Sequence, residues 1–275
     1  PCDMDELMKI AKKYNIYVVE DAAHSLPAWY GTQKENDNSD ETDEEGKKLE
    51  KRDKGKIIGT IGDITCFSFY ATKTLATGEG GIATTENSEW ADRMKRLRLH
   101  GISQDAWDRY SKEGSWYYEV VDAGYKYNMT DIQAGLGLVQ LKKLEWMWQR
   151  RREIARKYSQ AFEFFNEINT PHVKPDRESA WHLYVITLNL EMIKIDRNQF
   201  IEALKGRGIG TSVHFIPLYR HPYYKKTFNY RLEDFPSSEW IYKRMISLPI
   251  YPGMRDEDVW SVVAAVEDVV IKNRK

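Results

Sequence analysis

The sequence predicts an α/β fold followed by a second, smaller α+β domain, and three features of the chain support this. An amphipathic helical pattern at residues 1–15 runs directly into a short apolar strand at 16–19. Two further runs, at 64–70 and 82–85, have the aromatic and β-branched content of buried strands. Near residue 170 the pattern changes to short strands and helices. Alternation of helix and strand in the first part of the chain is typical of an α/β domain.

The later helices of this first part have recognisable starts. Ser88 is the expected N-cap of a helix that ends near Leu97, and residues 99–127 after it are loop-like. Thr130 and Gln133 form a capping-box pattern, in which Gln133 reaches back to the residue that begins the helix. A long helical region follows, with an apolar stripe made of Leu141, Leu144, Trp148, Ala155, Tyr158, Phe162 and Phe165.

Pro171 and Pro175 mark a linker between two domains. We expect a large domain over residues 1–165 and a small α+β domain over 166–275. The small domain is expected to contain a strand at 182–190, a helix from the cap Asp196 to Lys205, a strand at 211–216, and helices at 237–246 and 257–272.

Residues 34–56 are the clearest break in composition, because 16 of these 23 positions are charged. Acidic residues fill the first half of the run, and basic residues dominate the second half. Such a segment cannot bury enough apolar surface to offset its ordering entropy. We expect a solvated insertion, in which opposite charges could join two arms of a hairpin, and a binding arm is the less favoured alternative.

Composition excludes several classes of protein. The 41 basic and 42 acidic side chains give a net charge of −1, so no overall field attracts nucleic acid or an anionic membrane. Mean hydropathy is −0.65, and no apolar run approaches the roughly 18 residues of a membrane span. Cys2 and Cys66 cannot form a disulfide framework, and no secretory leader is recognisable, so a cytoplasmic location is expected. No metal-binding motif is present.

Three polar residues stand in apolar surroundings and suggest one chemistry. Asp21 follows a buried strand, Ser68 lies within the strand at 64–70, and Lys73 follows that strand just before a glycine-rich turn. Taken singly, they also fit a turn residue, a satisfied core hydroxyl and a surface charge. Pyridoxal 5'-phosphate needs such groups together: an amine that binds it covalently, a carboxylate beside the pyridine nitrogen, and donors for the phosphate.

Four ordered motifs carry a resemblance to a known family. The chain resembles the DegT/DnrJ/EryC1/StrS family of sugar aminotransferases at Val19-Glu20-Asp21-Ala22-Ala23-His24, at Cys66-Phe67-Ser68-Phe69-Tyr70-Ala71-Thr72-Lys73, at Thr77-Gly78-Glu79-Gly80-Gly81, and at Gly124-Tyr125-Lys126-Tyr127-Asn128-Met129-Thr130. The resemblance implies a fold-type-I aminotransferase with a mainly parallel central sheet in the large domain. It also implies a homodimer with its active sites at the subunit interface.

The same resemblance implies a role for each matching residue. Lys73 would bind the cofactor covalently and act as the catalytic residue. Asp21 would pair with the pyridine nitrogen, and Ala23 would pack on one face of the ring. The remaining contacts would come from His24 near the ring hydroxyl, Ser68 at the phosphate, and Asn128 at the phosphate of the neighbouring subunit.

For the reaction, the resemblance implies transfer of an amino group from glutamate to a keto-sugar nucleotide, in the synthesis of cell-surface polysaccharides or glycoconjugates. Relatives that dehydrate sugars carry His where this chain has Lys73, which favours the aminotransferase. A sugar dehydratase and a non-catalytic regulatory relative remain the alternatives.

Family members begin with roughly a hundred additional residues, which carry a phosphate-binding turn at a helix N-terminus. Neither that turn nor the aromatic residue that stacks on the cofactor is found in this sequence. Because helix termini are strong phosphate anchors, we expect these 275 residues to form a fragment with weakened cofactor affinity and an exposed sheet edge.

Overall fold

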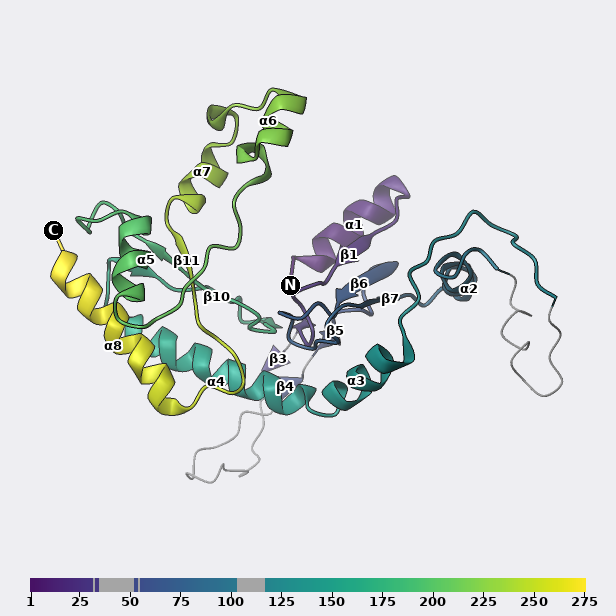
Figure 1. Ribbon diagram of the computed structural model, residues 1–275, viewed down its shortest axis with the longest axis horizontal. Helices are drawn as coiled ribbons and strands as arrows, with labels where there is room; N and C mark the ends of the chain where they lie inside the picture. Colours follow the sequence, from purple (N-terminus) through teal and green to yellow (C-terminus); the bar gives the residue numbers. More distant parts are fainter. Residues whose placement is uncertain (32, 35–51, 54, 103–116) are drawn as a thin grey trace. The chain divides into compact units, whose positions relative to one another are not determined.

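The computed structural model describes residues 1–31, 33–34, 52–53, 55–102 and 117–275 (Figure 1). The described chain forms two compact units. Unit 1 comprises Pro1–Glu145 and Lys174–Ala180, and unit 2 comprises Trp146–Val173 and Trp181–Lys275. Within the described residues, no helix has both the length and the apolarity that a membrane crossing requires.

The main sheet of unit 1 has three strands in the order β1-β6-β7. Strand β1 (Val19–Asp21) runs parallel to β6 (Ile64–Ser68), and β6 pairs antiparallel with β7 (Gly81–Thr84). Strands β6 and β7 were expected from the sequence, whereas the strand expected at 16–19 begins only at Val19 and extends to Asp21. The parallel pair places the ends of β1 and β6 side by side at one edge of the sheet, where open α/β sheets bind their ligands.

A second, antiparallel sheet in unit 1 has the order β5-β2-β9. Its strands are β2 (Trp29–Tyr30), β5 (Lys56–Ile57) and β9 (Arg177–Glu178), none of which was expected from the sequence. Two-residue strands are too short to produce a periodic pattern. The partly buried guanidinium of Arg177 lies over the ring of Tyr30 and pairs with Asp3 at 2.9 Å, which ties this sheet to the start of the chain.

The two ends of the charged run pair with each other. Strand β3 (Gln33–Lys34) is antiparallel to β4 (Arg52–Asp53), with Gln33 opposite Asp53. This is the backbone arrangement of a hairpin base. The expected joining of opposite charges falls on residues 35–51, which lie outside the described residues.

Three helices of unit 1 lie where the sequence predicted, and one of them has a different N-cap from the one expected. Helix α1 (Met4–Tyr14) carries basic residues in its last turn, and α3 (Asp131–Leu141) has the expected capping box between Thr130 and Gln133. Helix α2 (Ser88–Leu97) has the expected length, but its N-cap is Asn87. The Asn87 side-chain oxygen accepts a hydrogen bond from the backbone N–H of Trp90 at 3.1 Å, so Ser88 is the first helical residue and the expected cap was wrong by one position.

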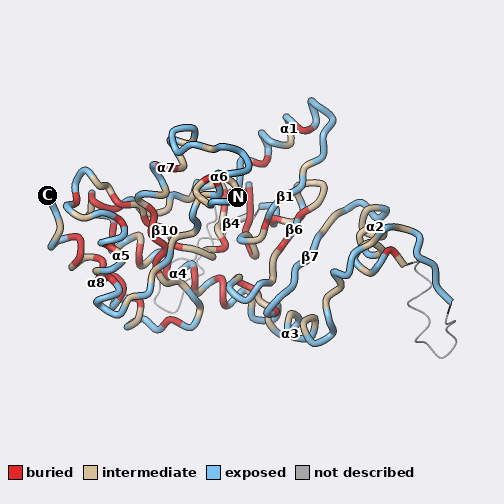
Figure 2. The backbone as a smooth tube through the Cα atoms, turned by 45° about the horizontal axis from the view of Figure 1, so that its top comes forward, coloured by how far each residue is buried: buried red, intermediate tan, exposed pale blue. Residues whose placement is uncertain are grey.

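Unit 2 is built on an antiparallel sheet in the order β11-β10-β8. The strands are β8 (Ile168–Asn169), β10 (Tyr184–Leu188) and β11 (Met245–Leu248). The helices that contribute buried residues to its core are α4 (Leu144–Phe162), α5 (Arg197–Lys205) and α8 (Asp256–Asn273). Figure 2 shows buried residues along β10 and the three helices, whereas α2, α3 and β7 of unit 1 are intermediate or exposed.

The segment between α5 and β11 differs from the expectation. Only Ser212 makes a strand-like bridge, to Ser247, so the strand expected at 211–216 does not form. The segment instead contains a 3-10 helix at Leu218–Arg220, α6 (Pro222–Phe228), a second 3-10 helix at Leu232–Asp234 and α7 (Pro236–Tyr242). Proline occupies the first position of both α-helices, where its missing N–H is tolerated.

Helix α4 belongs to unit 2 by its packing. Ile154, Ala155, Tyr158 and Phe162 are all buried in the core that contains β10 and α8. The part of the apolar stripe that includes Ala155, Tyr158 and Phe162 therefore packs in unit 2, whereas Leu141 of the same stripe ends α3 and is 53% exposed. The two packing units divide near residue 145. The domain limits 1–165 and 166–275 stay a prediction.

Candidate active site

Asp21 and Ser68 lie on the same face of the main sheet. Asp21 is the register partner of Cys66 across the parallel pair β1–β6, and Ser68 lies two residues beyond Cys66 on the same strand. Side chains two residues apart on a strand point to the same side. The face that carries both polar groups is open, because Asp21 and Cys66 are exposed and Ser68 is half-buried.

The backbone after β1 fixes the Asp21 carboxylate. Its Oδ1 accepts a hydrogen bond from the backbone N–H of Ala23 at 3.1 Å, and Ala22 between them is buried. The backbone N–H of Ala22 donates to the carbonyl of Cys66 at 2.8 Å, so the turn starts directly from the strand pair. Ala23 is half-buried beside the carboxylate, and His24 is exposed further along the turn.

Lys73 lies in the turn that follows β6. Its backbone N–H donates to the carbonyl of Tyr70 at 2.9 Å, and the next residue, Thr74, is buried and bonds through its hydroxyl to the carbonyl of Leu26. The Lys73 side chain is half-buried. Among the described residues, its amine has no hydrogen-bond or ion-pair partner, which leaves the nitrogen available for chemistry.

The glycine-rich turn is held by bonds that the sequence motif alone did not reveal. The Phe69 N–H donates to the Gly80 carbonyl at 2.8 Å, and the side-chain amide of Gln133 donates to the Glu79 carbonyl at 3.0 Å. A side chain at Gly80 would lie 2.8 Å from the Met129 methyl, and φ there is +151°. Gln133 thus caps α3 and anchors the turn at once, and only the first role was readable from the sequence.

Asn128 is positioned by a close crossing of two backbone segments. A Cβ on Gly124 would lie 2.0 Å from the backbone nitrogen of Gly101, which no side chain allows. The same two segments are joined by a hydrogen bond, in which the Tyr127 N–H donates to the Arg98 carbonyl at 2.8 Å. Asn128 follows directly, half-buried, and its side-chain oxygen accepts from the amine of Lys126. The sequence showed both glycines but not that they meet.

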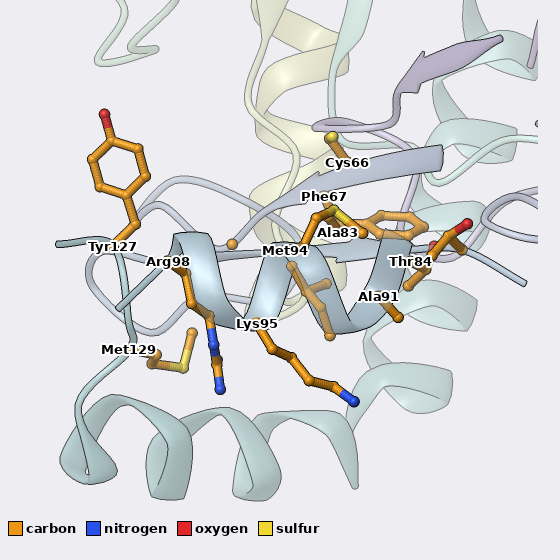
Figure 3. A pocket seen from close by; sticks show the side chains of 13 residues that line it. Cys66, Phe67, Ala83, Thr84, Ala91, Met94, Lys95, Arg98, Tyr127 and Met129 are labelled. Atoms are coloured by element: carbon orange, nitrogen blue, oxygen red, sulfur yellow. The ribbon is translucent and has the colours of Figure 1, made fainter. Parts of the chain in front are cut away.

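A cavity of about 670 Å³ lies in unit 1 beside these elements (Figure 3). Strands β6 and β7, helix α2 and the segment before α3 line it; Cys66, Ala83, Met94, Arg98, Tyr127 and Met129 are among the lining residues. Figure 3 shows Met94, Lys95 and Arg98 extending from α2. Its size is within the range of small-molecule sites, and its lining is mostly apolar.

The geometry fits a cofactor that has a basic ring and a phosphate. An exposed carboxylate and a hydroxyl share one sheet face, and an unpaired amine follows the same strand. These are the groups that pyridoxal phosphate requires for its ring nitrogen, its phosphate and its covalent attachment. In the described part of the chain, no cluster of three or more His, Cys, Asp or Glu could hold a metal ion.

Comparison with known proteins decides the family. Residues 1–267 match the DegT/DnrJ/EryC1/StrS aminotransferase family. The chain belongs to the DegT/DnrJ/EryC1/StrS aminotransferase family. The resemblance that the four sequence motifs indicated is therefore confirmed.

Two relatives in this family are similar over nearly the whole chain. Protein MJ1066 of Methanocaldococcus jannaschii is 56% identical over 274 residues, which cover 100% of this chain and 65% of the relative. The spore coat polysaccharide biosynthesis protein SpsC of Bacillus subtilis is 48% identical over 270 residues, which cover 98% of this chain and 64% of SpsC. The chain thus spans a little under two thirds of the length of these relatives.

A solved structure has the same fold. The protein described as a putative sugar aminotransferase, Spr1654 of Streptococcus pneumoniae in its PLP-form, superposes with a TM-score of 0.80 at 30% identity, over 99% of this chain and 66% of Spr1654. The same protein is also known in a PMP-form. The fold-type-I α/β architecture expected from the sequence is confirmed, and pyridoxal 5'-phosphate is the cofactor that the comparison supports.

Proposed function

We propose that this protein acts as a pyridoxal-phosphate-dependent aminotransferase. The observation that carries the proposal is the joint placement of Asp21, Ser68 and Lys73, with the carboxylate and the hydroxyl on one open sheet face and the unpaired amine on the following turn. Membership of an aminotransferase family supports the same reaction class. A dehydratase is less favoured, because position 73 is a lysine.

Each residue has a distinct task in this proposal. When bound, pyridoxal phosphate supplies an electron sink that stabilises negative charge on the carbon next to the amino group. The Asp21 carboxylate, held by the Ala23 N–H, would stabilise a proton on the ring nitrogen by its opposite charge. The Lys73 amine would hold the cofactor covalently, and its Nζ would serve as the base that takes and returns a proton during amino transfer.

The remaining expected residues orient the cofactor. Ser68 Oγ would donate to the phosphate of the cofactor, and Ala23 would pack on one face of the ring. His24 would approach the ring hydroxyl. Asn128 would bind the phosphate in the neighbouring subunit of a homodimer, and it follows the close crossing of Gly101 and Gly124.

The proposed amino donor is glutamate, and the proposed acceptor is a keto-sugar nucleotide. The relation to SpsC, a protein of spore coat polysaccharide biosynthesis, supports a sugar acceptor and a role in cell-surface polysaccharide or glycoconjugate synthesis. We further propose that the enzyme works as a homodimer in the cytoplasm.

Covalent trapping at Lys73 tests the proposal. The protein is incubated with excess pyridoxal phosphate, reduced with borohydride, digested and mapped by mass spectrometry. We expect a pyridoxyl adduct on Lys73 and its loss in Lys73→Ala. Lys142→Ala is the matched control, because this exposed lysine follows α3 away from the glycine-rich turn, and it should leave the adduct unchanged. An adduct spread over many surface lysines, with none specific to Lys73, would refute the assignment.

A further inference from the structure

A groove of about 620 Å³ lies in unit 2, where α4 ends and the chain turns into β8. Every residue that lines it belongs to the stretch between Ser159 and Thr170, so one compact unit forms the whole groove. Its volume is within the range of small-molecule sites. It is built from elements other than those that carry Asp21, Ser68 and Lys73, and the proposed reaction gives it no task.

The floor of the groove is apolar and fixed in position. Phe162 is 1% exposed and Ile168 is 5% exposed, and both belong to the core of unit 2. Half-buried Phe165 packs against the same core. Because side chains in a close-packed core are held by their neighbours, this floor offers a constant apolar surface to a ligand.

The rim of the groove is polar, and most of its groups have no partner within the protein. The exposed lining residues are Gln160, Glu163, Asn166 and Asn169. Among the described residues, the side chains of Gln160, Glu163 and Asn166 make no hydrogen bond or ion pair. Asn169 donates through its amide nitrogen to Thr187 Oγ1 at 3.4 Å, which leaves its carbonyl oxygen available. An amide carries both donors and an acceptor, so the rim can bond to hydroxyl groups, which also donate and accept.

The groove also carries negative charge that the protein does not offset. A helix has a partial negative charge at its C-terminus, which basic side chains in the last turn stabilise. The last turns of α5 and α8 contain Lys205 and Lys272, whereas the last turn of α4 contains no basic residue. Glu163 follows α4 directly, and it is the one ionisable side chain among the lining residues that the structure describes. A ligand with a single positive charge would offset both the helix end and this carboxylate.

We propose that this groove is a second binding site of the protein, and that its ligand is a protonated aminosugar. The ammonium group lies at Glu163 and the end of α4. The sugar hydroxyl groups bond to the amides of the rim, and the apolar face of the sugar ring lies on the floor of the groove. The amino sugar formed by the proposed aminotransferase belongs to this class, and only that link to the enzyme's own product rests on the proposed function.

Two other kinds of cation fit the groove less well. A divalent metal ion such as calcium takes six to eight oxygen ligands, several of them carboxylates. Glu163 is the only carboxylate among the described lining residues, and no described cluster of three or more His, Cys, Asp or Glu could hold a metal ion. A polyamine carries several positive charges and no hydroxyl group, so it would leave the rim amides without partners. One carboxylate beside amides and an apolar floor matches one amino group on a polyol.

A titration followed by NMR tests the proposal. The isotope-labelled chain, without added pyridoxal phosphate, is titrated with glucosamine at low ionic strength and below the pKa of the sugar's amine. The side-chain amide signals of Gln160, Asn166 and Asn169 are assigned from the corresponding Ala variants. We expect these three signals to shift together, with a Kd on the order of 1 mM. Glucose, which lacks the amino group, should bind about fivefold more weakly.

Glu163→Gln keeps the shape of the side chain and removes its charge. It should weaken glucosamine binding by about fivefold and leave glucose binding unchanged, because only the ammonium group responds to the carboxylate. Glu257→Gln is the matched control, since Glu257 is an exposed carboxylate of α8 outside the groove, and this variant should bind glucosamine like the parent chain. Circular dichroism of each variant checks that it is folded.

Three results would overturn the proposal. Glucosamine could leave the three amide signals unshifted, or it could bind Glu163→Gln with the same affinity as the parent chain. Alternatively, magnesium or calcium chloride could shift these signals at a lower concentration than glucosamine, which would identify an inorganic cation as the occupant. None of these readouts depends on the cofactor, so failure here is distinguishable from failure of the Lys73 adduct.

Discussion

The two units of this protein are stabilised in different ways. Unit 2 has a core cluster of 21 buried apolar residues contributed by helices and strands, whereas the corresponding cluster described in unit 1 has seven. In unit 1 the backbone is fixed instead by caps, by the crossing of Gly101 and Gly124, and by hydrogen bonds between turns. The backbone around the proposed site is therefore positioned by hydrogen bonds and close backbone contacts more than by the burial of apolar side chains.

A cation in each unit illustrates the same contrast. In unit 2, the buried Arg151 donates through Nη1 to the carbonyls of Trp181, His182 and Ile250, and burial lowers the pKa of its guanidinium to about 10. It links α4 to the two segments flanking the sheet. In the described part of unit 1, the half-buried Lys73 amine bonds to nothing. The Arg151 guanidinium stabilises the structure of unit 2, whereas the Lys73 amine of unit 1 is available to react.

The substitution with the largest expected effect on stability removes a side chain from the core of unit 2. Phe200 is fully buried, so Phe200→Ala should lower the free energy of unfolding by about 3–5 kcal/mol. Ile132→Ala in unit 1 removes an apolar side chain that is 87% exposed and should cost less than about 0.5 kcal/mol. Urea unfolding measures both changes. Equal costs at the two positions would show that unit 1 buries α3 in solution.

A pair of glycines tests whether unit 1 depends on its backbone crossing. Gly124→Ala would force a Cβ to within 2.0 Å of the Gly101 nitrogen and should destabilise unit 1 by about 3 kcal/mol through overpacking. Gly135 in α3 has no atom within 4 Å of the added Cβ, so Gly135→Ala should stabilise the helix by about 0.5–1 kcal/mol. Hydrogen exchange of the Tyr125 and Tyr127 amides reports on the crossing. Unchanged protection in Gly124→Ala would contradict the steric argument.

The third test concerns the ion pair between Arg220 and Glu239 in unit 2, whose loss should cost less than the loss of Phe200 or of the glycine crossing. Arg220 holds the pKa of the Glu239 carboxyl below its ordinary value by hydrogen bonding. The unfolded chain therefore binds a proton first as pH falls, so the stabilisation is present above the ordinary pKa of about 4.5 and is lost as pH falls through the lowered value.

Glu239→Gln should remove this acid dependence and cost about 2 kcal/mol near neutral pH. Thermal unfolding measured between pH 3 and 7 checks the result. The Asp3 carboxylate of unit 1, which pairs with Lys174 at 53% exposure, should respond to added salt instead, because exposed pairs are screened. A pH profile that is identical in Glu239→Gln and in the parent chain would exclude the ion pair as its source.

Much of the fold could be predicted because local signals were strong. The capping box at Thr130 and the cap Asp196 located two helix starts, since the side chains that satisfy the first N–H groups are specified by residue type and spacing. Strands β6 and β7 of the main sheet were visible from their aromatic and β-branched residues. Ser88 and Asn87 are both good caps, so the one-residue error there arose from a choice that composition alone cannot make.

The rest depends on contacts between distant residues. The expected strand at 211–216 has the right composition, but only Ser212 meets β11, and the following residues turn away into the 3-10 helix before α6. Likewise Asp21, Ser68 and Lys73 could be selected from the sequence, but not their common face, which follows from the register of Asp21 opposite Cys66. Register is set by the whole sheet and leaves no local trace.

The short strands before β6 have a consequence for how this protein can vary. Trp29 opposite Ile57 and Gln33 opposite Asp53 close the charged segment at its neck, before the chain re-enters the main sheet. The free energy of closing a chain segment rises slowly with its length, by about 0.6 kcal/mol for each doubling, and both pairings lie between this segment and the main sheet. Mutation can therefore lengthen, shorten or recharge this stretch while Asp21 and Cys66 remain neighbours.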